Sequence, residues 1–173
     1  SCTDHTITHH LQNTTPTHTF PFDRVYDQPT RETRLIFEQV CVDVIEGAVK
    51  EGISGTVFAY GQTSAGKTFT MQGPPENPGI IPLGLHHFFD TITMISRERE
   101  VTVKMSYLEV YNEIVGDLLQ KDNCNLKIHE TVEKGIFVGN LSEPQVSTVQ
   151  EALELVKKGE EVRKCGKTNM NDY

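Results

Sequence analysis

The residues best suited to chemistry form one short run, Gly61-Gln62-Thr63-Ser64-Ala65-Gly66-Lys67-Thr68. The run matches the pattern GxxxxGK[ST], which about one random chain of this size in a hundred would contain by chance. Gly61 and Gly66 let the backbone curl so that successive N–H groups point inward, and Lys67 adds a cation. The pattern predicts a loop that binds nucleotide phosphates. The competing interpretation is a glycine turn that closes a hairpin.

Each residue type in this run suits a polyanion. Backbone N–H groups and the start of a following helix attract negative charge. Lys67 would reach the β- and γ-phosphates, and the Thr68 hydroxyl would ligate Mg²⁺. Hydrolysis also needs a carboxylate at the end of a second strand and a group that positions water.

The available carboxylates are Asp23, Asp43, Asp90 and Asp117. None ends a run of four apolar residues, so the sequence assigns no catalytic residue.

The loop needs a strand before it and a helix after it, and the flanking residues predict both. Thr56–Tyr60 is apolar on both faces, which predicts a fully buried strand. Lys67–Met71 would open the helix. A longer helix is expected over residues 30–51, with Thr30 or Thr33 as its cap and glycines at its end.

The remaining segments alternate between predicted strands and helices. The predicted strands are an edge strand at Phe20–Tyr26, a long strand at Val101–Tyr111, and a hairpin of Leu126–His129 with Gly135–Val138. The predicted helices are residues 82–96 and Val149–Val162, the second with a capping box, and Pro74–Gly79 predicts an exposed loop. This order indicates an α/β fold with the glycine loop at a strand's carboxyl end, where open α/β sheets bind ligands.

Composition and charge exclude several classes of protein. A chain of 173 residues can form one domain with a core. The net charge of −8 argues against a nucleic-acid binder. No run of about 18 apolar residues exists, so we expect no membrane span. The four cysteines are far apart, which favours reduced thiols in a cytosolic protein over disulfides or a zinc site.

Two other constellations carry weaker signals. His9-His10 and His86-His87 are adjacent pairs and lack the i, i+4 spacing of a helical metal site. Glu109 and Glu113 lie four apart on the predicted long strand, a spacing that could suggest paired carboxylates for glycoside chemistry. Polar residues on one face of a sheet are the favoured interpretation.

The segment Gly55–Met71 resembles the phosphate-loop segment of kinesin motor domains almost letter for letter. Four further segments agree with that family in order and spacing, namely Phe20–Tyr26, Gly79–Pro82, Ser106–Glu113 and Thr168–Asn171. The resemblance covers residues 20–173, and within the family the sequence pattern is most similar to motors of the centromere-associated subfamily. We therefore expect residues 1–173 to be part of a motor domain, with a polar loop or hairpin region at residues 1–19.

The resemblance implies a fold and residue roles. It implies a P-loop NTPase-type kinesin motor fold, with a central mixed sheet flanked by helices. ATP or ADP with Mg²⁺ would be held through Gln62–Thr68, and the aromatic ring of Phe69 would pack against the adenine. The alternative for Phe69 is a helix residue in the core. Asn171 matches the residue that opens the switch I motif.

The departures from the family pattern are equally informative. The chain stops at Tyr173, directly before the family's Ser-Ser-Arg-Ser-His, and it contains no Asp-Leu-Ala-Gly-Ser-Glu segment. Thr56–Tyr60 would then lack neighbouring strands, which would leave backbone groups unpaired. We expect the 173 residues alone not to form a stable domain and to be inactive as an ATPase.

The implied function is the nucleotide-binding part of a microtubule motor whose complete domain hydrolyses ATP. Its expected partner is tubulin, contacted mostly through segments outside this chain, and its dimer would form through a stalk. The implied location is the cytoplasm and cytoskeleton. A truncated kinesin that binds nucleotide weakly, or binds only its partners, is one alternative. An unrelated P-loop kinase or ATPase would need a basic lid and a Walker-B strand, and neither is found.

Overall fold

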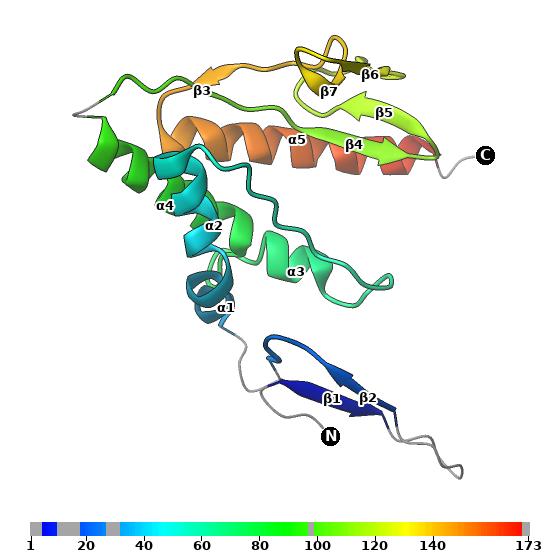
Figure 1. Ribbon diagram of the computed structural model, residues 1–173. Coiled ribbons are helices and arrows are strands. Elements are labelled where there is room, and N and C mark those ends of the chain that lie inside the picture. Colours follow the sequence, from blue (N-terminus) through cyan, green and yellow to red (C-terminus); the bar gives the residue numbers. More distant parts are fainter. Residues whose placement is uncertain (1–4, 10–17, 27–31, 97–98, 171–173) are drawn as a thin grey trace. The chain divides into compact units, whose positions relative to one another are not determined.

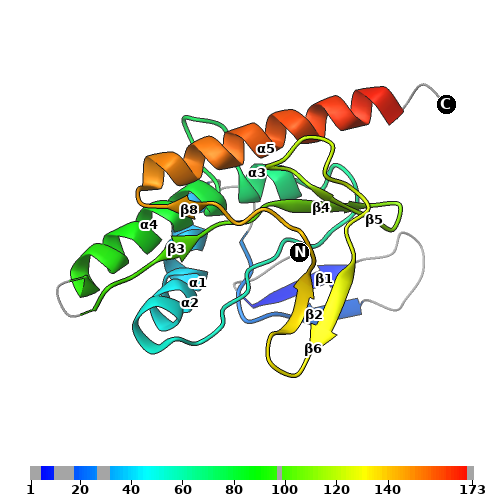
Figure 2. The ribbon, with the colours of Figure 1, turned by 90° about the horizontal axis from the view of Figure 1, so that it is seen from above.

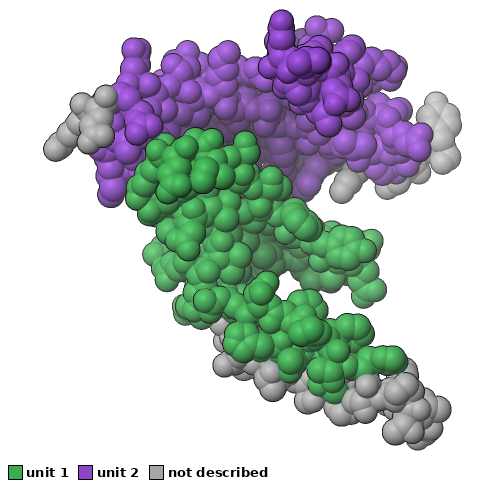
Figure 3. Space-filling model, viewed as in Figure 1, with its two compact units in different colours: residues 1–87 green, residues 88–173 purple. Residues whose placement is uncertain are grey.

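The computed structural model describes residues 5–9, 18–26, 32–96 and 99–170, with residues 9 and 164–170 described through their backbone alone. The described part mixes helices and strands, as the sequence predicts, and its strands form two-stranded antiparallel pairs (Figures 1 and 2). Among the described helices, none has the length and apolar character to cross a bilayer. The chain divides into two compact units, residues 1–87 and 88–173 (Figure 3).

The first unit begins with an antiparallel hairpin of β1 (Thr6–His9) and β2 (His18–Pro21). The pairing continues one residue beyond the strands, because the Phe22 N–H donates to the His5 carbonyl at 2.8 Å. The predicted strand Phe20–Tyr26 is right in type but wrong in its bounds. It begins earlier than expected and ends at Pro21, whose nitrogen cannot donate a ladder hydrogen bond.

The helix predicted over residues 30–51 consists of three consecutive pieces. They are α1 (Thr33–Val40), α2 (Val42–Glu46) and the π-helix η1 (Gly47–Glu51). Thr33 is not the cap: Glu32 holds that position without a side-chain cap bond, and Thr33 is helical and 2% exposed. The other expected cap, Thr30, lies outside the described residues. Gly52 ends the run with φ 73°, in the left-handed region that glycine adopts readily.

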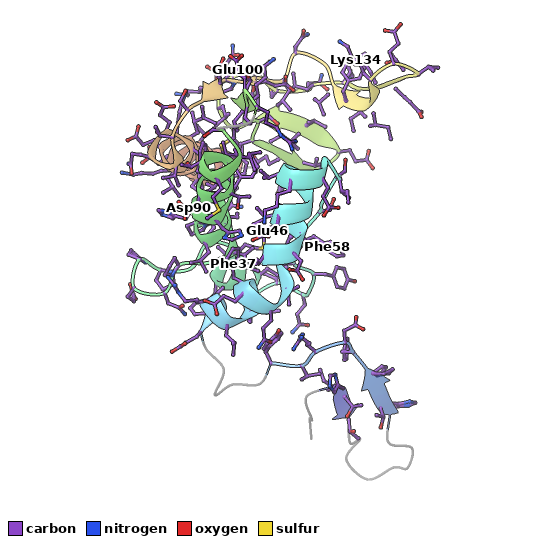
Figure 4. The ribbon with its side chains drawn as sticks, turned by 60° about the vertical axis from the view of Figure 1, so that its left-hand side comes forward. Phe37, Glu46, Phe58, Asp90, Glu100 and Lys134 are labelled. Atoms are coloured by element: carbon purple, nitrogen blue, oxygen red, sulfur yellow. The ribbon has the colours of Figure 1, made fainter. Side chains whose placement is uncertain are left out.

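The core of the first unit is small and joins α1 to α4 (Ile80–Ile95). Phe37, Cys41 and Leu83 are buried, and partly buried apolar side chains of Val42, Ile45 and Ile80 pack against them. Phe37 is labelled in Figure 4. Burial raises the pKa of the Cys41 thiol, which therefore remains protonated and unreactive at neutral pH.

The helix α3 (Lys67–Met71) begins at the predicted residue, Lys67. A loop closed at a narrow neck separates it from α4, which begins two residues before the predicted start. The Gly79 N–H donates to the Gln72 carbonyl at 2.8 Å, and a Cβ on Gly73 (φ 65°) would lie 2.2 Å from the Asn77 oxygen. The neck therefore requires glycine. The loop predicted at 74–79 is confirmed as non-helical, but the prediction that it is exposed is right only for Pro75 and Glu76, and Gly79 is buried.

The second unit contains three strand pairs. They are β3 (Val103–Lys104) with β8 (Gln145–Val146), β4 (Leu108–Tyr111) with β5 (Ile114–Asp117), and β6 (Ile128–Thr131) with β7 (Gly135–Val138). The predicted hairpin is confirmed by β6 and β7.

The single long strand predicted over Val101–Tyr111 is wrong in its centre. Residues 105–107 leave the ladder because the chain changes partners there. The Met105 N–H donates to the Pro144 carbonyl at 3.0 Å, whereas the Tyr107 carbonyl accepts from the Leu118 N–H at 2.8 Å. The sequence-based prediction missed both partner strands, β5 and β8.

The helix α5 (Val149–Met170) lies beside β4 and β5 (Figures 1 and 2) and extends beyond its predicted end. The capping box is confirmed, because the Glu151 N–H donates to Thr148 Oγ1 at 3.2 Å and the Glu151 carboxylate accepts from the Ser147 N–H at 2.7 Å. A Cβ on Gly159 would lie 2.3 Å from Tyr107 Cδ1. Glycine therefore lets the helix reach the tyrosine ring, whose hydroxyl donates to Glu160.

Candidate functional site

The segment that leads into the glycine loop is extended but is not a strand. Residues 53–60 pair with no strand among the described residues, and Phe58 and Tyr60 are 80% and 95% exposed. Phe58 is labelled in Figure 4. The predicted buried strand Thr56–Tyr60 is therefore wrong for this structure, since burial requires neighbouring strands on both sides. Gly55 holds the segment against α2, where an added Cβ would lie 2.5 Å from Val44 Cγ1.

The loop itself is a compact curl. The Ala65 N–H donates to the Gln62 carbonyl at 3.2 Å, which closes a turn. Ser64 (φ 66°) and Gly66 (φ 94°) both have left-handed backbone conformations. Gly66 occupies a conformation that a side chain would strain, and a Cβ on Gly61 would approach Ala65 Cβ to 3.3 Å. The backbone path thus requires glycine at position 66 and favours it at position 61.

Lys67 lies at the end of the curl and folds back over it. Its Nζ donates to the carbonyl oxygens of Gly61 and Gln62, each at 2.7 Å. An ammonium group has three donors, so one remains after these two bonds. The arrangement places a cation beside the backbone of the loop rather than at the end of a freely extended side chain.

The donors of this loop fit a polyanion. The N–H groups of Gln62, Thr63, Ser64 and Gly66 make no hydrogen bond with any described residue, and those residues are exposed. The Thr68 hydroxyl likewise has no partner in the described part of the chain, so its oxygen is available as a ligand. Several N–H donors, a lysine and a hydroxyl on one curled segment are the groups that bind phosphate and its cation. The helix α3 has only five residues, so its dipole adds little.

Phe69 follows the loop on the first turn of α3. Its side chain is 48% exposed, so the alternative that it is a core residue is wrong in this structure. An aromatic face exposed next to a phosphate loop could pack against a planar ring.

The predicted carboxylate candidates do not form a second catalytic group. Asp23, Asp43 and Asp90 are exposed. Asp117 is 4% exposed, but both of its oxygens already accept hydrogen bonds from the protein. The bonds come from the N–H groups of Leu119 (2.8 Å), Gln120 (3.3 Å) and Ser142 (2.9 Å) and from Asn123 Nδ2 (3.1 Å). We call this set of five residues the Asp117 junction.

The Asp117 junction is structural. Burial acts to raise the pKa of the Asp117 carboxyl, but the hydrogen bonds from Ser142, Leu119 and Asn123 outweigh it, so the pKa is lowered. The junction joins the end of β5 to the chain on both sides of the β6–β7 hairpin. Sequence reasoning missed this role and considered Asp117 only as a candidate for the carboxylate that hydrolysis needs at the end of a second strand. The one available signal was an Asp followed within six residues by an Asn, which is common in turns.

The weaker constellations also have plain structural explanations. His87 Nε2 lies 3.3 Å from Glu46 Oε1, and the His87 ring meets the Phe37 ring edge-on at 6.0 Å. The Glu46 carboxylate also pairs with Lys50, whose hydrogen bond lowers the pKa of Glu46. Glu109 and Glu113 do not share a strand, because Glu113 lies in the turn between β4 and β5. In the described ranges, no cluster of three His, Cys, Asp or Glu residues could hold a metal.

The comparisons with known proteins agree with one another. The family model described as "Kinesin motor domain" matches residues 2–173. "Kinesin-like protein KIN-7O" of Arabidopsis thaliana is 47% identical over 154 residues, which is 89% of this chain and 12% of that protein. "Kinesin-like protein KIN-7L" of Oryza sativa subsp. japonica is 43% identical over 162 residues, 94% of this chain and 25% of that protein.

A solved structure is similar over nearly the whole chain. It is titled "Structure of a fast kinesin: Implications for ATPase mechanism and interactions with microtubules", and it has a TM-score of 0.86 and 35% sequence identity. The match covers 99% of this chain and 48% of the solved chain. The chain therefore spans about half of that solved chain and a quarter or less of the two relatives.

Proposed function

Since this chain belongs to the kinesin motor-domain family, we propose that it is the nucleotide-binding part of a microtubule motor. In this proposal the chain binds ATP or ADP with Mg²⁺, and the complete motor domain hydrolyses ATP to move along microtubules. The observation that carries the proposal is the curled loop Gly61–Thr68, in which unpaired N–H donors and the Lys67 ammonium lie on one segment.

Each residue of the loop has a stated part in binding. The N–H groups of Gln62, Thr63, Ser64 and Gly66 donate to phosphate oxygens. Lys67 exchanges its bonds to the Gly61 and Gln62 carbonyls for bonds to phosphate, so its charge moves only a short distance. The Thr68 hydroxyl is the protein's ligand for Mg²⁺, which neutralises phosphate charge when it is bound. Phe69 packs against the adenine.

The proposal assigns binding, not hydrolysis, to this chain. The carboxylate with the most buried position, Asp117, has its oxygens engaged in the Asp117 junction and does not serve as the Walker-B group. The groups that orient water and sense the γ-phosphate would come from outside these residues. The expected location is the cytoplasm and cytoskeleton.

The proposed partner is tubulin, without nucleic acid, and the proposed oligomer is a dimer formed through a stalk. The charge of the chain fits a division of labour. Its net charge is −8, whereas a surface that binds the acidic face of a filament or a nucleic acid needs a basic excess. Most of the filament contact is therefore proposed to come from segments outside this chain.

Titration with a fluorescent ATP analogue, with and without Mg²⁺, tests the proposal. Lys67→Ala removes the cation from the loop, and we expect it to weaken binding about 100-fold, because charge-assisted hydrogen bonds are lost. Thr68→Val should reduce the dependence on Mg²⁺. Lys50→Ala is the matched control, since this exposed lysine pairs with Glu46 away from the loop. Equal affinity in Lys67→Ala and Lys50→Ala would remove the assignment.

A further inference from the structure

The neck between α3 and α4, formed by Gln72, Gly73 and Gly79, brings two stretches of backbone into close contact. The Gly79 N–H donates to the Gln72 carbonyl at 2.8 Å. A Cβ on Gly73 would lie 2.6 Å from the Gly79 nitrogen, and a Cβ on Gly79 would lie 2.5 Å from the Gln72 nitrogen. Cβ atoms do not approach backbone this closely, so the closed neck needs glycine at both positions.

The neck attaches α3 to the packed part of the first unit. The Leu83 N–H donates to the Gly79 carbonyl at 3.2 Å, so Gly79 belongs to the hydrogen-bonded start of α4. Leu83 is buried in one cluster with Phe37 and Cys41. On the other side of the phosphate loop, residues 53–60 pair with no strand in the described ranges and supply no ladder of their own. The neck therefore fixes α3 to this core.

The neck also reaches the backbone of Thr68. The Thr68 carbonyl accepts hydrogen bonds from the Gln72 N–H at 2.8 Å and from the Gly73 N–H at 3.3 Å. Because α3 has only five residues, there is little helix between Gly73 and Thr68 to absorb a displacement. A change in the backbone at Gly73 should therefore move Thr68.

Lys67 is held differently from Thr68. Its Nζ donates to the carbonyls of Gly61 and Gln62, which belong to the phosphate loop itself. Movement of the neck should therefore displace the Thr68 hydroxyl more than the Lys67 ammonium. The hydroxyl is the proposed ligand of Mg²⁺, an ion that demands nearly ideal octahedral geometry and tolerates little displacement of its ligands.

We propose that Gly73 and Gly79 are positioning residues for the Mg²⁺ ligand of the nucleotide site. Through the closed neck they set where the Thr68 hydroxyl lies when the nucleotide binds. The role rests on the proposed nucleotide binding, since it concerns the metal that accompanies the phosphates. It gives glycines outside the phosphate-loop pattern control over the metal-dependent part of the affinity.

The ratio of ATP-analogue affinities with and without Mg²⁺ measures this role in the complete motor domain that carries this sequence. A general loosening of the site lowers both affinities alike and cancels in the ratio. Gly73→Ala forces the neck open and should lower the ratio about tenfold, as the loss of a group that orients a metal ligand does. Gly47→Ala is the matched control, because a Cβ there meets nothing within 4 Å. Equal ratios in the two variants would overturn the proposal.

A gentler pair of variants in the same loop guards against a folding defect in Gly73→Ala. Pro78 is half-buried, and its carbonyl carbon lies 2.9 Å from the place of a Cβ on Gly73. Pro78→Gly frees the backbone beside the neck without adding an atom, and should lower the ratio about threefold. Pro75→Gly makes the same change at an exposed position of the loop and should leave the ratio unchanged. Equal ratios in Pro78→Gly and Pro75→Gly would contradict the role of the neck.

A double-mutant cycle with Thr68→Val shows whether the neck acts through the hydroxyl. Once the hydroxyl is removed, Gly73→Ala should change the ratio by less than about twofold. An undiminished effect of Gly73→Ala in the Thr68→Val background would assign the effect to another group and overturn the proposal.

Lys67→Ala separates the role of the neck from nucleotide binding itself. Normal ATP-analogue affinity in Lys67→Ala would refute binding at the phosphate loop, and the role of the neck with it. Weakened affinity in Lys67→Ala, together with an unchanged Mg²⁺ ratio in Gly73→Ala, would refute the role of the neck alone.

Discussion

The loop Gly61–Thr68 and the Asp117 junction are both polar and lie mostly outside helices and strands, but they differ in how their hydrogen bonds are completed. The phosphate loop is exposed, and most of its N–H groups have no partner among the described residues. In the Asp117 junction a buried carboxylate accepts four hydrogen bonds from the protein itself. The difference distinguishes a segment built to bind a ligand from one that holds the chain together.

The largest expected effect comes from removing the acceptor in the Asp117 junction. Asp117→Ala leaves the buried N–H of Leu119 and the partly buried N–H of Ser142 without an acceptor, and should lower the free energy of unfolding by about 3 kcal/mol. Urea denaturation of the complete motor domain that carries this sequence, followed by circular dichroism, measures this change. Asp90→Ala, an exposed acid in the same unit, should change stability by less than about 0.5 kcal/mol.

Nucleotide affinity should separate a variant of the Asp117 junction from a variant of the phosphate loop. Asp117→Ala should leave ATP-analogue binding unchanged under conditions in which the protein is folded, whereas Lys67→Ala should weaken binding and leave stability nearly unchanged. A loss of Mg²⁺-dependent affinity in folded Asp117→Ala protein would show that Asp117 belongs to the nucleotide site, contrary to its place in the junction.

Acid should weaken the Asp117 junction in a defined direction. The folded-state pKa of Asp117 is lowered, so its carboxylate stabilises the fold fully above the unfolded pKa of about 4. This stability is lost as the pH falls from about 4 through the lower folded pKa, where the protonated form accepts fewer hydrogen bonds.

The difference between wild type and Asp117→Asn isolates this contribution. Asparagine carries no titratable proton, so the gap in unfolding free energy between the two proteins should be largest near pH 7 and shrink below about pH 4. Glu46→Gln is the comparison in the first unit, because the pKa of Glu46 is also lowered but the residue is only partly buried and is paired with Lys50. A gap that stays constant down to the acid unfolding transition would contradict the assignment.

The phosphate loop could be predicted because its information is local. The glycines, Lys67 and Thr68 lie within eight consecutive positions, and the start of α3 and the capping box of α5 were also predicted from short patterns. Such features depend on backbone conformation and neighbouring side chains, both of which the sequence states directly.

The failed predictions depend on partners that are distant in sequence. Thr56–Tyr60 has the composition of a buried strand, but no described strand pairs with it. The stretch Val101–Tyr111 was predicted as one strand because alternation continues across residues 105–107, although its pairing partner changes there. Asp117 lies 25 positions before Ser142, and no local pattern reveals that this serine N–H completes its bonds.

The smallest expected effects come from replacing two residues whose backbone is left-handed. One of them lies in the first compact unit and the other in the second. Ser64 (φ 66°) lies in the phosphate loop and Glu113 (φ 64°) lies in the β4–β5 turn, where an L side chain costs about 1–2 kcal/mol. Glycine relieves this cost but adds freedom to the unfolded chain, so Glu113→Gly should stabilise the protein by about 0.5 kcal/mol. Glu109→Gly, in the regular part of β4, should instead destabilise it by about 1 kcal/mol.

Ser64→Gly makes the same backbone change in the phosphate loop that Glu113→Gly makes in the β4–β5 turn, but in the loop it should also affect nucleotide binding. We expect a similar small gain in unfolding free energy, together with a twofold to fivefold loss of nucleotide affinity at about 25 °C, because a freer loop must lose more entropy when it orders around phosphate. Thermal denaturation and the ATP-analogue titration measure the two quantities. Unchanged affinity in Ser64→Gly would mean that Ala65, Gly66 and Lys67 fix the curl without help from the conformation of Ser64.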